Sequence, residues 1–160
     1  MTDIIVIGGG IAGISAAARL ARFGKVTVLE REGQLAYHAS GRSSALYEPN
    51  YGKPAVVALS KASGDFFHTA NGGVLSPRGV MMVGKADEVD AFARDSAALN
   101  LDDMSVSEAK AMVPIIDENI VTQAAYHDGA YDIDTDRLIQ NFAREVTRRD
   151  GQIVGQADVT

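Results

Sequence analysis

The first part of the chain alternates short apolar runs with an amphipathic segment. Residues 3–7 and 25–29 are rich in β-branched apolar residues, and glycines follow the first run. This composition is typical of buried parallel strands. Between the two runs, apolar residues recur at three- and four-residue steps: Ile11, Ile14, Ala18 and Ala21. The spacing predicts a helix with one buried face, capped at its C-terminus by Gly24. Residues 3–31 therefore predict a strand–helix–strand unit with a right-handed crossover.

The remainder of the chain predicts a mixture of helices and strands. The expected elements are a loop over 33–53, helices over 54–70, 87–99, 107–113 and 134–149, strands over 74–83 and 153–154, and a strand pair over 124–133. Turn-forming residues at 127–129 predict that the strand pair is a hairpin. In the last helix, Leu138, Phe142 and Val146 follow at four-residue steps, which predicts a buried face. The order of elements favours an α/β fold with an inserted α+β part.

Composition and charge exclude several classes of protein. The 160 residues are 46% hydrophobic, which excludes a disordered chain, and a net charge of −6 argues against a nucleic-acid binder with a basic face. Cysteine is absent, which excludes disulfides and thiolate catalysis. The histidines His38, His68 and His127 lie too far apart in sequence to predict a metal site. No basic residue precedes the first apolar run, so we expect a cytoplasmic protein without a secretory signal or membrane span.

The strongest chemical signal is a glycine motif, Gly8-Gly9-Gly10-Ile11-Ala12-Gly13, which matches G-x-G-x-x-G. Its position between a predicted strand and a predicted helix is that of a dinucleotide-binding turn. In such a turn Gly8 permits the tight bend, Gly10 lets a pyrophosphate approach the backbone, and Gly13 lets helix and strand pack closely. Free N–H groups at the start of the helix would donate to phosphate oxygens.

An acidic residue, Glu30, ends the second predicted strand, seventeen residues beyond Gly13. A carboxylate at this point accepts hydrogen bonds from ribose hydroxyls, and it disfavours NADP because the 2′-phosphate would meet a negative charge. These residues predict a dinucleotide but leave NAD and FAD both open. The alternative interpretation is a plain glycine turn with a surface glutamate.

Further segments resemble a known family. Glu30-Arg31 and the segment YHASGRSSALY, from Tyr37 to Tyr47, resemble the D-amino-acid oxidase/dehydrogenase superfamily of FAD-dependent enzymes, most closely its D-arginine dehydrogenase-like members. The stretch 128–138 is similar to the family's return into its FAD domain. The resemblance implies a Rossmann-like FAD-binding βαβ unit of the glutathione-reductase type, with part of a substrate domain inserted into it. The implied boundaries are 1–50 and 134–160 for the FAD-binding domain and 51–133 for the substrate part.

The resemblance also implies FAD as the cofactor and a set of residues that contact it. These are Gly8, Gly10, Ile11, Ala12, Gly13, Glu30, Arg31, Gly41, Arg42, Ser43, Ser44 and Val159. In the family's pattern Glu30 holds the adenosine ribose with Arg31 beside the adenine, and the segment 41–44 runs along the flavin. Val159, at the start of a further expected strand, supplies a backbone contact to adenine. On composition alone, segment 41–44 is also compatible with a solvated polar loop.

The implied reaction is oxidation of the carbon–nitrogen bond of an amino acid or related amine. Hydride passes from the carbon that carries the amine to the flavin, and the imine hydrolyses to an oxo-acid. No catalytic acid or base is evident from the sequence. Tyr47 and Tyr51 are substrate-side candidates, and packing is the alternative role for each. Leu46 and Val80 stand where D-arginine dehydrogenase-like relatives carry a histidine and an acid, so we expect a neutral or small amine substrate rather than D-arginine.

Family members are considerably longer than this chain, which resembles their N-terminal part. We expect the rest of the FAD and substrate domains, with the arginine that clamps the substrate carboxylate, in the same longer protein or in another chain. Residues 157–160 are expected to lie in or beside a strand at an open sheet edge. Three functions remain open: a flavin-dependent amine oxidoreductase, an NAD-dependent enzyme, and a non-catalytic FAD-binding subunit or truncated product.

Overall fold

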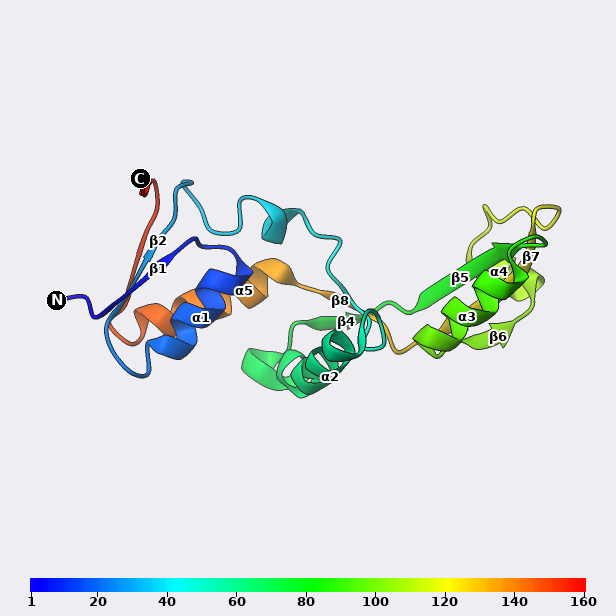
Figure 1. Cartoon of the computed structure of the whole chain (residues 1–160), viewed down its shortest axis with the longest axis horizontal. Helices are drawn as coiled ribbons and strands as arrows, with labels where there is room; N and C mark the ends of the chain where they lie inside the picture. Colours follow the sequence, from blue (N-terminus) through cyan, green and yellow to red (C-terminus); the bar gives the residue numbers. More distant parts are fainter. The chain divides into compact units, whose positions relative to one another are not determined.

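The computed structural model describes residues 1–160 and divides them into two compact units (Figure 1). Unit 1 comprises residues 1–45 and 133–160, and unit 2 comprises residues 46–132. The boundaries expected from the sequence fall after residues 50 and 133, so the structure assigns residues 46–50 to unit 2. None of the helices is both long and apolar enough to cross a lipid bilayer.

Unit 1 contains a parallel three-stranded sheet in the order β1-β2-β9. Its elements are β1 (Ile4–Ile7), α1 (Ile11–Leu20), β2 (Val26–Leu29), η1 (Ala39–Arg42), α5 (Thr135–Thr147) and β9 (Gln152–Val154). In the register of the sheet, Ile4 lies opposite Val26, and Thr27 lies opposite Gln152. Strand β2 returns parallel to β1 after helix α1, which confirms the predicted α/β fold and its βαβ unit.

The core of unit 1 lies on one face of this sheet. Helices α1 and α5 pack against each other and against the strands (Figure 1). The most deeply buried apolar residues are Ile14, Ala17, Ala18, Val26, Val28, Ile139 and Val146. On the opposite face, the Ile5 and Ile7 side chains of β1 are 61% and 67% exposed. The prediction of a buried strand over residues 3–7 is therefore wrong for this face of β1, because the helices of this chain cover only one side of the sheet.

Unit 2 contains two further three-stranded sheets, in the orders β3-β8-β4 and β5-β7-β6. Its elements are β3 (Leu46–Tyr47), α2 (Pro54–Thr69), η2 (Ala70–Gly72), β4 (Leu75–Pro77), β5 (Val80–Lys85), α3 (Val89–Leu99), β6 (Asp102–Met104), α4 (Val106–Met112), β7 (Val121–His127) and β8 (Tyr131–Ile133), the last residue of which falls in unit 1. Local signals explain where two helices begin. Proline stands in the first turn of α2, and Ser105 and Glu108 form a reciprocal capping box at the start of α4.

The hairpin predicted around residues 127–129 is wrong. Strand β7 pairs antiparallel with β5 and β6, whereas β8 pairs antiparallel with β3, with Tyr131 opposite Tyr47. The turn residues therefore lead the chain from one sheet into the other. Turn chemistry is local and cannot distinguish a hairpin from such a passage, because the partner strands come from distant parts of the sequence.

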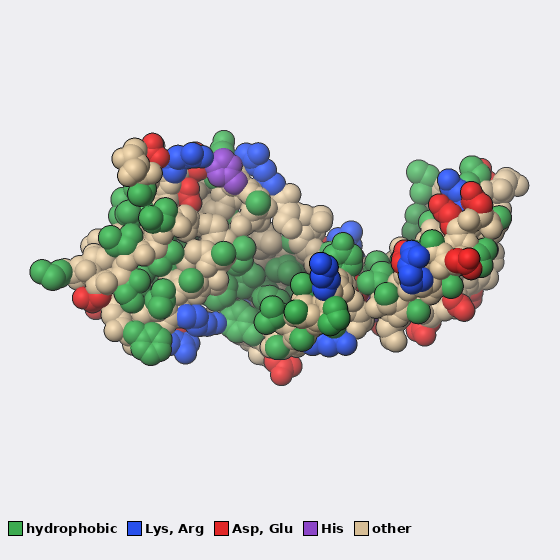
Figure 2. Space-filling view, viewed as in Figure 1, with side chains coloured by type: hydrophobic (Ala, Val, Ile, Leu, Met, Phe, Trp, Pro, Cys, Tyr) green, Lys and Arg blue, Asp and Glu red, His purple; other side chains and the backbone are tan.

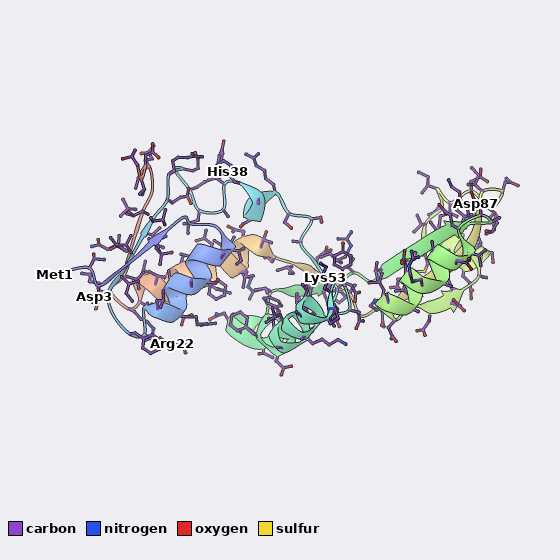
Figure 3. All side chains as sticks on the ribbon, in the orientation of Figure 1. Met1, Asp3, Arg22, His38, Lys53 and Asp87 are labelled. Atoms are coloured by element: carbon purple, nitrogen blue, oxygen red, sulfur yellow. The ribbon has the colours of Figure 1, made fainter.

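Two expectations at the ends of elements are also wrong. Helix α1 ends at Leu20 with Ala21 as its C-cap, so Gly24 does not cap it. A Cβ on Gly24 would lie 3.2 Å from the side chain of Asp3, which is labelled in Figure 3, so this glycine admits a close approach of Asp3. The further strand expected to begin at Val159 does not form; residues 157–160 lie beside a strand instead, since the Ala157 N–H donates to the Glu30 carbonyl at the end of β2 at 2.9 Å.

Candidate cofactor site

The glycine turn between β1 and α1 depends on two of its glycines for steric reasons. Gly8 has a φ of +97°, a conformation that favours glycine, and its N–H donates to the Leu29 carbonyl of β2 at 2.8 Å. A Cβ on Gly13 would collide with the Gly8 carbonyl oxygen and would lie 3.5 Å from Val6. The turn is therefore as tight as the motif predicts, with helix and strand in direct backbone contact.

The first turn of α1 presents unpaired backbone donors. The first intrahelical bond runs from the Ile14 N–H to the Gly10 carbonyl at 3.0 Å, and the N–H groups of Ala12 and Gly13 donate to no other group of the chain. No acidic side chain lies in this turn. The Ile11 N–H donates to the Ser40 hydroxyl at 3.0 Å. A helix N-terminus with free donors and no acidic residue in its first turn favours an anion.

Glu30 lies at the mouth of this turn. Its two carboxylate oxygens accept the N–H of Gly9 at 2.5 Å and the N–H of Glu32 at 3.0 Å. The bond from Glu32, assisted by the bond from Gly9, outweighs partial burial and lowers the pKa of Glu30 below its ordinary value of 4.5. The group is therefore ionised at neutral pH. An ionised carboxylate has further lone pairs that can accept hydroxyl groups of a sugar.

The loop over residues 32–45 packs onto the glycine turn. The Ala36 N–H donates to the Gly9 carbonyl at 3.1 Å, and the Leu35 side chain lies against Gly9. A Cβ on Gly41 would collide with the Ala36 carbonyl, so a larger residue would displace the loop. The Arg42 Nε donates to the Tyr37 carbonyl at 3.2 Å. These contacts bring Gly41 and Arg42 of the predicted set into the same unit as the turn.

A cavity of about 460 Å³ lies between this loop and the start of α5. Its wall includes Tyr37, Gly41 and Arg42 from the loop, and Thr135 and Asp136 from the helix. No residue of α5 was predicted to be part of the site. The cavity extends the site beyond the glycine turn because both regions share the loop.

This arrangement belongs to a known protein family. The model described as "FAD dependent oxidoreductase", DAO, matches residues 3–160, which is nearly the whole chain. The chain is a member of the DAO family. Its members are FAD-dependent oxidoreductases, so FAD is the dinucleotide of the family and the NAD alternative is not supported.

Two kinds of relatives share parts of this DAO chain. Among curated proteins, the tRNA 5-methylaminomethyl-2-thiouridine biosynthesis bifunctional protein MnmC of Burkholderia thailandensis is 37% identical over 70 residues, which cover 43% of this chain and 11% of the relative. Among solved structures, the L-α-glycerophosphate oxidase of Mycoplasma pneumoniae has a TM-score of 0.81 at 17% identity, covering 99% of this chain and 45% of the other.

Two amino-acid enzymes have the same fold. The glycine oxidase of Bacillus cereus has a TM-score of 0.81 at 20% identity, and the match covers 99% of this chain and 48% of the glycine oxidase chain. The L-proline dehydrogenase of P. horikoshii has a TM-score of 0.80 at 24% identity, covering 99% of this chain and 45% of the other. At these identities the likeness shows the fold alone. The chain spans less than half the length of each of these proteins.

The residues of the turn fit the adenosine diphosphate part of FAD. A phosphate group needs N–H donors, which the first turn of α1 provides, and a ribose needs an acceptor, which Glu30 provides. Ser40 was not among the cofactor-binding residues predicted from the sequence. Because a hydroxyl both accepts and donates, Ser40 can accept the Ile11 N–H and still donate to a phosphate oxygen. Its neighbour Gly41 was named, but composition does not reveal which serine of the loop meets the helix.

A charged cluster lies beside Glu30. Glu32 pairs with His38 at 2.9 Å and with Arg31 at 3.3 Å, and the bond from His38 is the main cause that lowers the pKa of Glu32. Figure 3 labels His38 on the loop before η1, and Figure 2 shows its purple side chain flanked by blue basic side chains on this face. Sequence reasoning found Arg31 but missed Glu32 and His38, since a polar loop without periodicity gives no signal for such a cluster.

The remaining predicted residues form no hydrogen bond with the glycine turn itself, although the Ala157 N–H, two residues before Val159, donates to the Glu30 carbonyl at 2.9 Å. The Ser43 hydroxyl accepts the Ala45 N–H at 3.0 Å, and Val159 is an exposed residue in the irregular end of the chain. Both tyrosine candidates belong to unit 2. Tyr47 is buried and donates its hydroxyl to the Ser60 carbonyl at 3.0 Å, and burial raises its pKa, whereas Tyr51 is 70% exposed. Of the two, Tyr51 is therefore the side chain free to meet a ligand.

Proposed function

We propose that unit 1 holds the adenosine diphosphate part of FAD through the glycine turn. In this proposal Gly10, Ala12 and Gly13 face the pyrophosphate, Glu30 accepts the ribose hydroxyls, and Arg31 lies beside the adenine. The observation that carries it is the Glu30 carboxylate beside a helix turn in which the Ala12 and Gly13 N–H groups are free. The loop 41–44 follows toward the flavin, and Val159 remains a proposed adenine contact. In the same proposal, residues 51–133 belong to the substrate domain.

We further propose that the whole protein oxidises the carbon–nitrogen bond of a small or neutral amino acid or amine. Bound flavin supplies the hydride acceptor for this oxidation. The protein's part is to bind the substrate, orient its C–H bond and keep the amine accessible, and Tyr51 is the proposed substrate-side residue of this chain. The imine that forms is hydrolysed to an oxo compound and an amine or ammonia.

The relatives support an amine substrate without agreeing on one molecule. Glycine oxidase and L-proline dehydrogenase are named for amino acids, and the curated relative is named for a uridine that carries a methylaminomethyl group. The glycerophosphate oxidase is the exception. Leu46 is partly exposed and apolar, and Val80 is apolar too, so neither supplies a charge that would pair with a guanidinium. These two residues favour a neutral substrate over D-arginine.

Titration of the 160-residue chain with FAD tests the cofactor site. Wild-type chain is expected to quench flavin fluorescence, and Glu30→Gln is expected to weaken FAD binding by about tenfold or more, because a charged acceptor of the ribose is lost. Glu118→Gln, which removes an exposed ion pair with Lys110, serves as the matched control and should leave the affinity unchanged. Equal FAD affinity in both variants would contradict the assignment of Glu30.

Anaerobic reduction of the flavin in the whole protein tests the reaction. Addition of glycine, sarcosine, proline or another neutral amino acid is expected to bleach the visible flavin absorbance, and D-arginine to do so far more slowly. Bleaching by glycerol 3-phosphate alone would replace the amine proposal with oxidation of an alcohol. A bound flavin that no compound reduces would identify a non-catalytic FAD-binding protein.

A further inference from the structure

Unit 2 contains a buried carboxylate–imidazole pair, Glu48 and His127, which the cofactor site does not use. The His127 Nε2 and the Glu48 Oε2 lie 2.7 Å apart, and the two side chains are 13% and 3% exposed. Glu48 follows β3 and His127 ends β7, so the pair joins segments of two different sheets. A buried carboxylate persists only where hydrogen bonds compensate for lost water.

The hydrogen bonds of His127 define which ring nitrogen carries the proton. Its Nδ1 lies 2.8 Å from the Gly129 nitrogen, which donates its N–H to it. A nitrogen that accepts an N–H carries no hydrogen of its own, so the proton of the neutral ring lies on Nε2. The Nε2–H then donates to Glu48, and the pair consists of a neutral imidazole and a carboxylate. Both ring nitrogens and both carboxylate oxygens have partners.

The second oxygen of Glu48 fixes the turn that follows β3. Its Oε1 accepts the Asn50 N–H at 2.9 Å, and the Glu48 carbonyl accepts the Tyr51 N–H at 3.1 Å. The Asn50 side chain in turn donates to the Leu99 carbonyl of α3 at 3.3 Å. The turn over residues 48–51 is therefore held at its start, middle and end. His127 is the group that fixes the orientation of Glu48.

This turn forms one wall of an open cavity of about 620 Å³ at the surface of unit 2. Asn50, Tyr51 and Gly52 line one part of it, and Met82 of β5 and Leu99 of α3 line another. A shift of the turn would move Tyr51 and change the shape of the cavity. The pair is thus connected to the cavity wall by hydrogen bonds, because Glu48 accepts the N–H groups of Asn50 and Tyr51, which line the cavity.

We propose that Glu48 and His127 are positioning residues that set the conformation of the 48–51 turn and so the place of Tyr51 in the substrate site. This inference rests on the proposed function, in which Tyr51 is the substrate-side residue. The pair contacts no reacting atom; it acts through the Asn50 and Tyr51 backbone. Its proton arrangement is the part that a purely apolar contact could not replace.

Two substitutions separate the hydrogen bonds of the two ring nitrogens of His127. In His127→Gln the longer amide can place an N–H donor near the position of Nε2, which preserves the bond to Glu48. In His127→Asn the shorter amide can place an oxygen near the position of Nδ1, which preserves the bond from Gly129 and loses the one to Glu48. If the pair positions the turn, the glutamine variant retains the position of Tyr51 and the asparagine variant does not.

Nuclear magnetic resonance of the 160-residue chain provides the first test. Long-range proton–nitrogen spectra of the wild type are expected to show His127 protonated on Nε2 and bare on Nδ1. Amide exchange of Asn50 and Tyr51 is expected to accelerate about tenfold or more in His127→Asn and Glu48→Gln, and to stay within about twofold of wild type in His127→Gln and in the control Glu118→Gln. A proton on Nδ1, equal acceleration in both His127 variants, or no acceleration in any variant overturns the proposal. A proton on Nδ1 of the wild type overturns the proposal even where a variant fails to fold.

Kinetics of the whole protein provides the second test. With an amine that reduces the flavin, His127→Asn is expected to raise KM about tenfold while kcat and FAD affinity change less than twofold, and His127→Gln is expected to restore KM. A fall in kcat or in FAD affinity with KM unchanged overturns the positioning role. If no amine reduces the wild-type flavin, the proposed function fails, whereas the tautomer and the exchange rates still decide whether the pair holds the turn.

Discussion

The glycine turn of unit 1 and the Glu48–His127 pair of unit 2 are both polar, but their hydrogen bonding differs. In the turn, N–H groups of Ala12 and Gly13 have no acceptor in the chain. In the pair, each polar atom of the two side chains has a partner, and no buried side-chain polar atom of the chain is unpaired. Free donors at a helix N-terminus indicate a place for a ligand, whereas a satisfied buried pair indicates a part that holds other parts in position.

The two regions also differ in the kind of substitution that would disrupt them. Gly13 tolerates no Cβ because the nearest atom is backbone, which cannot rotate away. The pair depends on the choice of protonated nitrogen and on the length of a side chain. Four substitutions or conditions separate these cases, beginning with the one that is expected to have the largest effect.

Gly13→Ala is expected to destabilise the chain by about 3 kcal/mol and to abolish FAD binding, because the new methyl group would overlap the Gly8 carbonyl. Urea unfolding and flavin titration measure the two effects. Gly33→Ala is the matched control, since a Cβ there meets no atom within 4 Å, and it should change stability by less than about 0.5 kcal/mol. Similar stability of the two variants would show that the turn is looser than described.

Glu48→Ala is expected to destabilise the chain by about 2 kcal/mol, because the buried Asn50 N–H and His127 lose a charged acceptor. FAD affinity of the folded variant should be unchanged, in contrast to Gly13→Ala. Urea unfolding followed by circular dichroism gives the stability, with Glu118→Ala as an exposed control. A loss of FAD affinity in Glu48→Ala without a loss of stability would contradict the view that Glu48 supports the fold and not the cofactor site.

Ser40→Ala is expected to weaken FAD binding by about threefold to tenfold, because the hydroxyl on the Ile11 N–H is lost and a neutral hydrogen bond contributes about 1 kcal/mol. The measurement is flavin fluorescence titration. Ser107→Ala on the exposed face of α4 is the control. An unchanged affinity in Ser40→Ala would mean that this hydroxyl only closes the loop.

Acid is expected to have the smallest effect at the turn. The folded-state pKa of Glu30 lies below the ordinary value of 4.5, so its hydrogen bonds stabilise the fold fully above that pH and lose their effect as the pH falls through the folded pKa. Below about pH 4.5 the wild type should therefore lose stability more steeply than Glu30→Gln. Urea midpoints measured across this range give the comparison. Parallel curves for the two proteins would indicate that Glu30 makes no such bonds.

Much of the fold and of the turn was predictable from the sequence. The βαβ unit followed from β-branched runs and helical spacing, and the buried positions Leu138, Phe142 and Val146 of α5 followed from their four-residue steps. Glu30 was found because the distance from the glycine motif to the end of the next strand is short and regular. These features depend on neighbours close in sequence, for which periodicity is informative.

Other features depended on contacts that span the sequence. The passage of the chain from β7 into β8 differs from the predicted hairpin because each strand found partners elsewhere. Neither Glu48 nor His127 was a candidate, since 79 residues separate them and a single glutamate or histidine carries no motif. Ser40, Glu32 and His38 were missed for a similar reason, because their roles depend on how an irregular loop folds back.

Local sterics and hydrophobic spacing leave few alternatives for the strand–helix–strand start, the glycine turn and the acidic residue that faces it, so these features can be derived from the amino-acid sequence. The pairing of the strands in unit 2, the serine that meets the helix, and the nitrogen of His127 that carries a proton are set by contacts that form only in the folded chain. Those outcomes depend on the geometry of groups brought together from distant parts of the chain, and hydrogen bonding in a buried site selects among arrangements that one sequence allows equally.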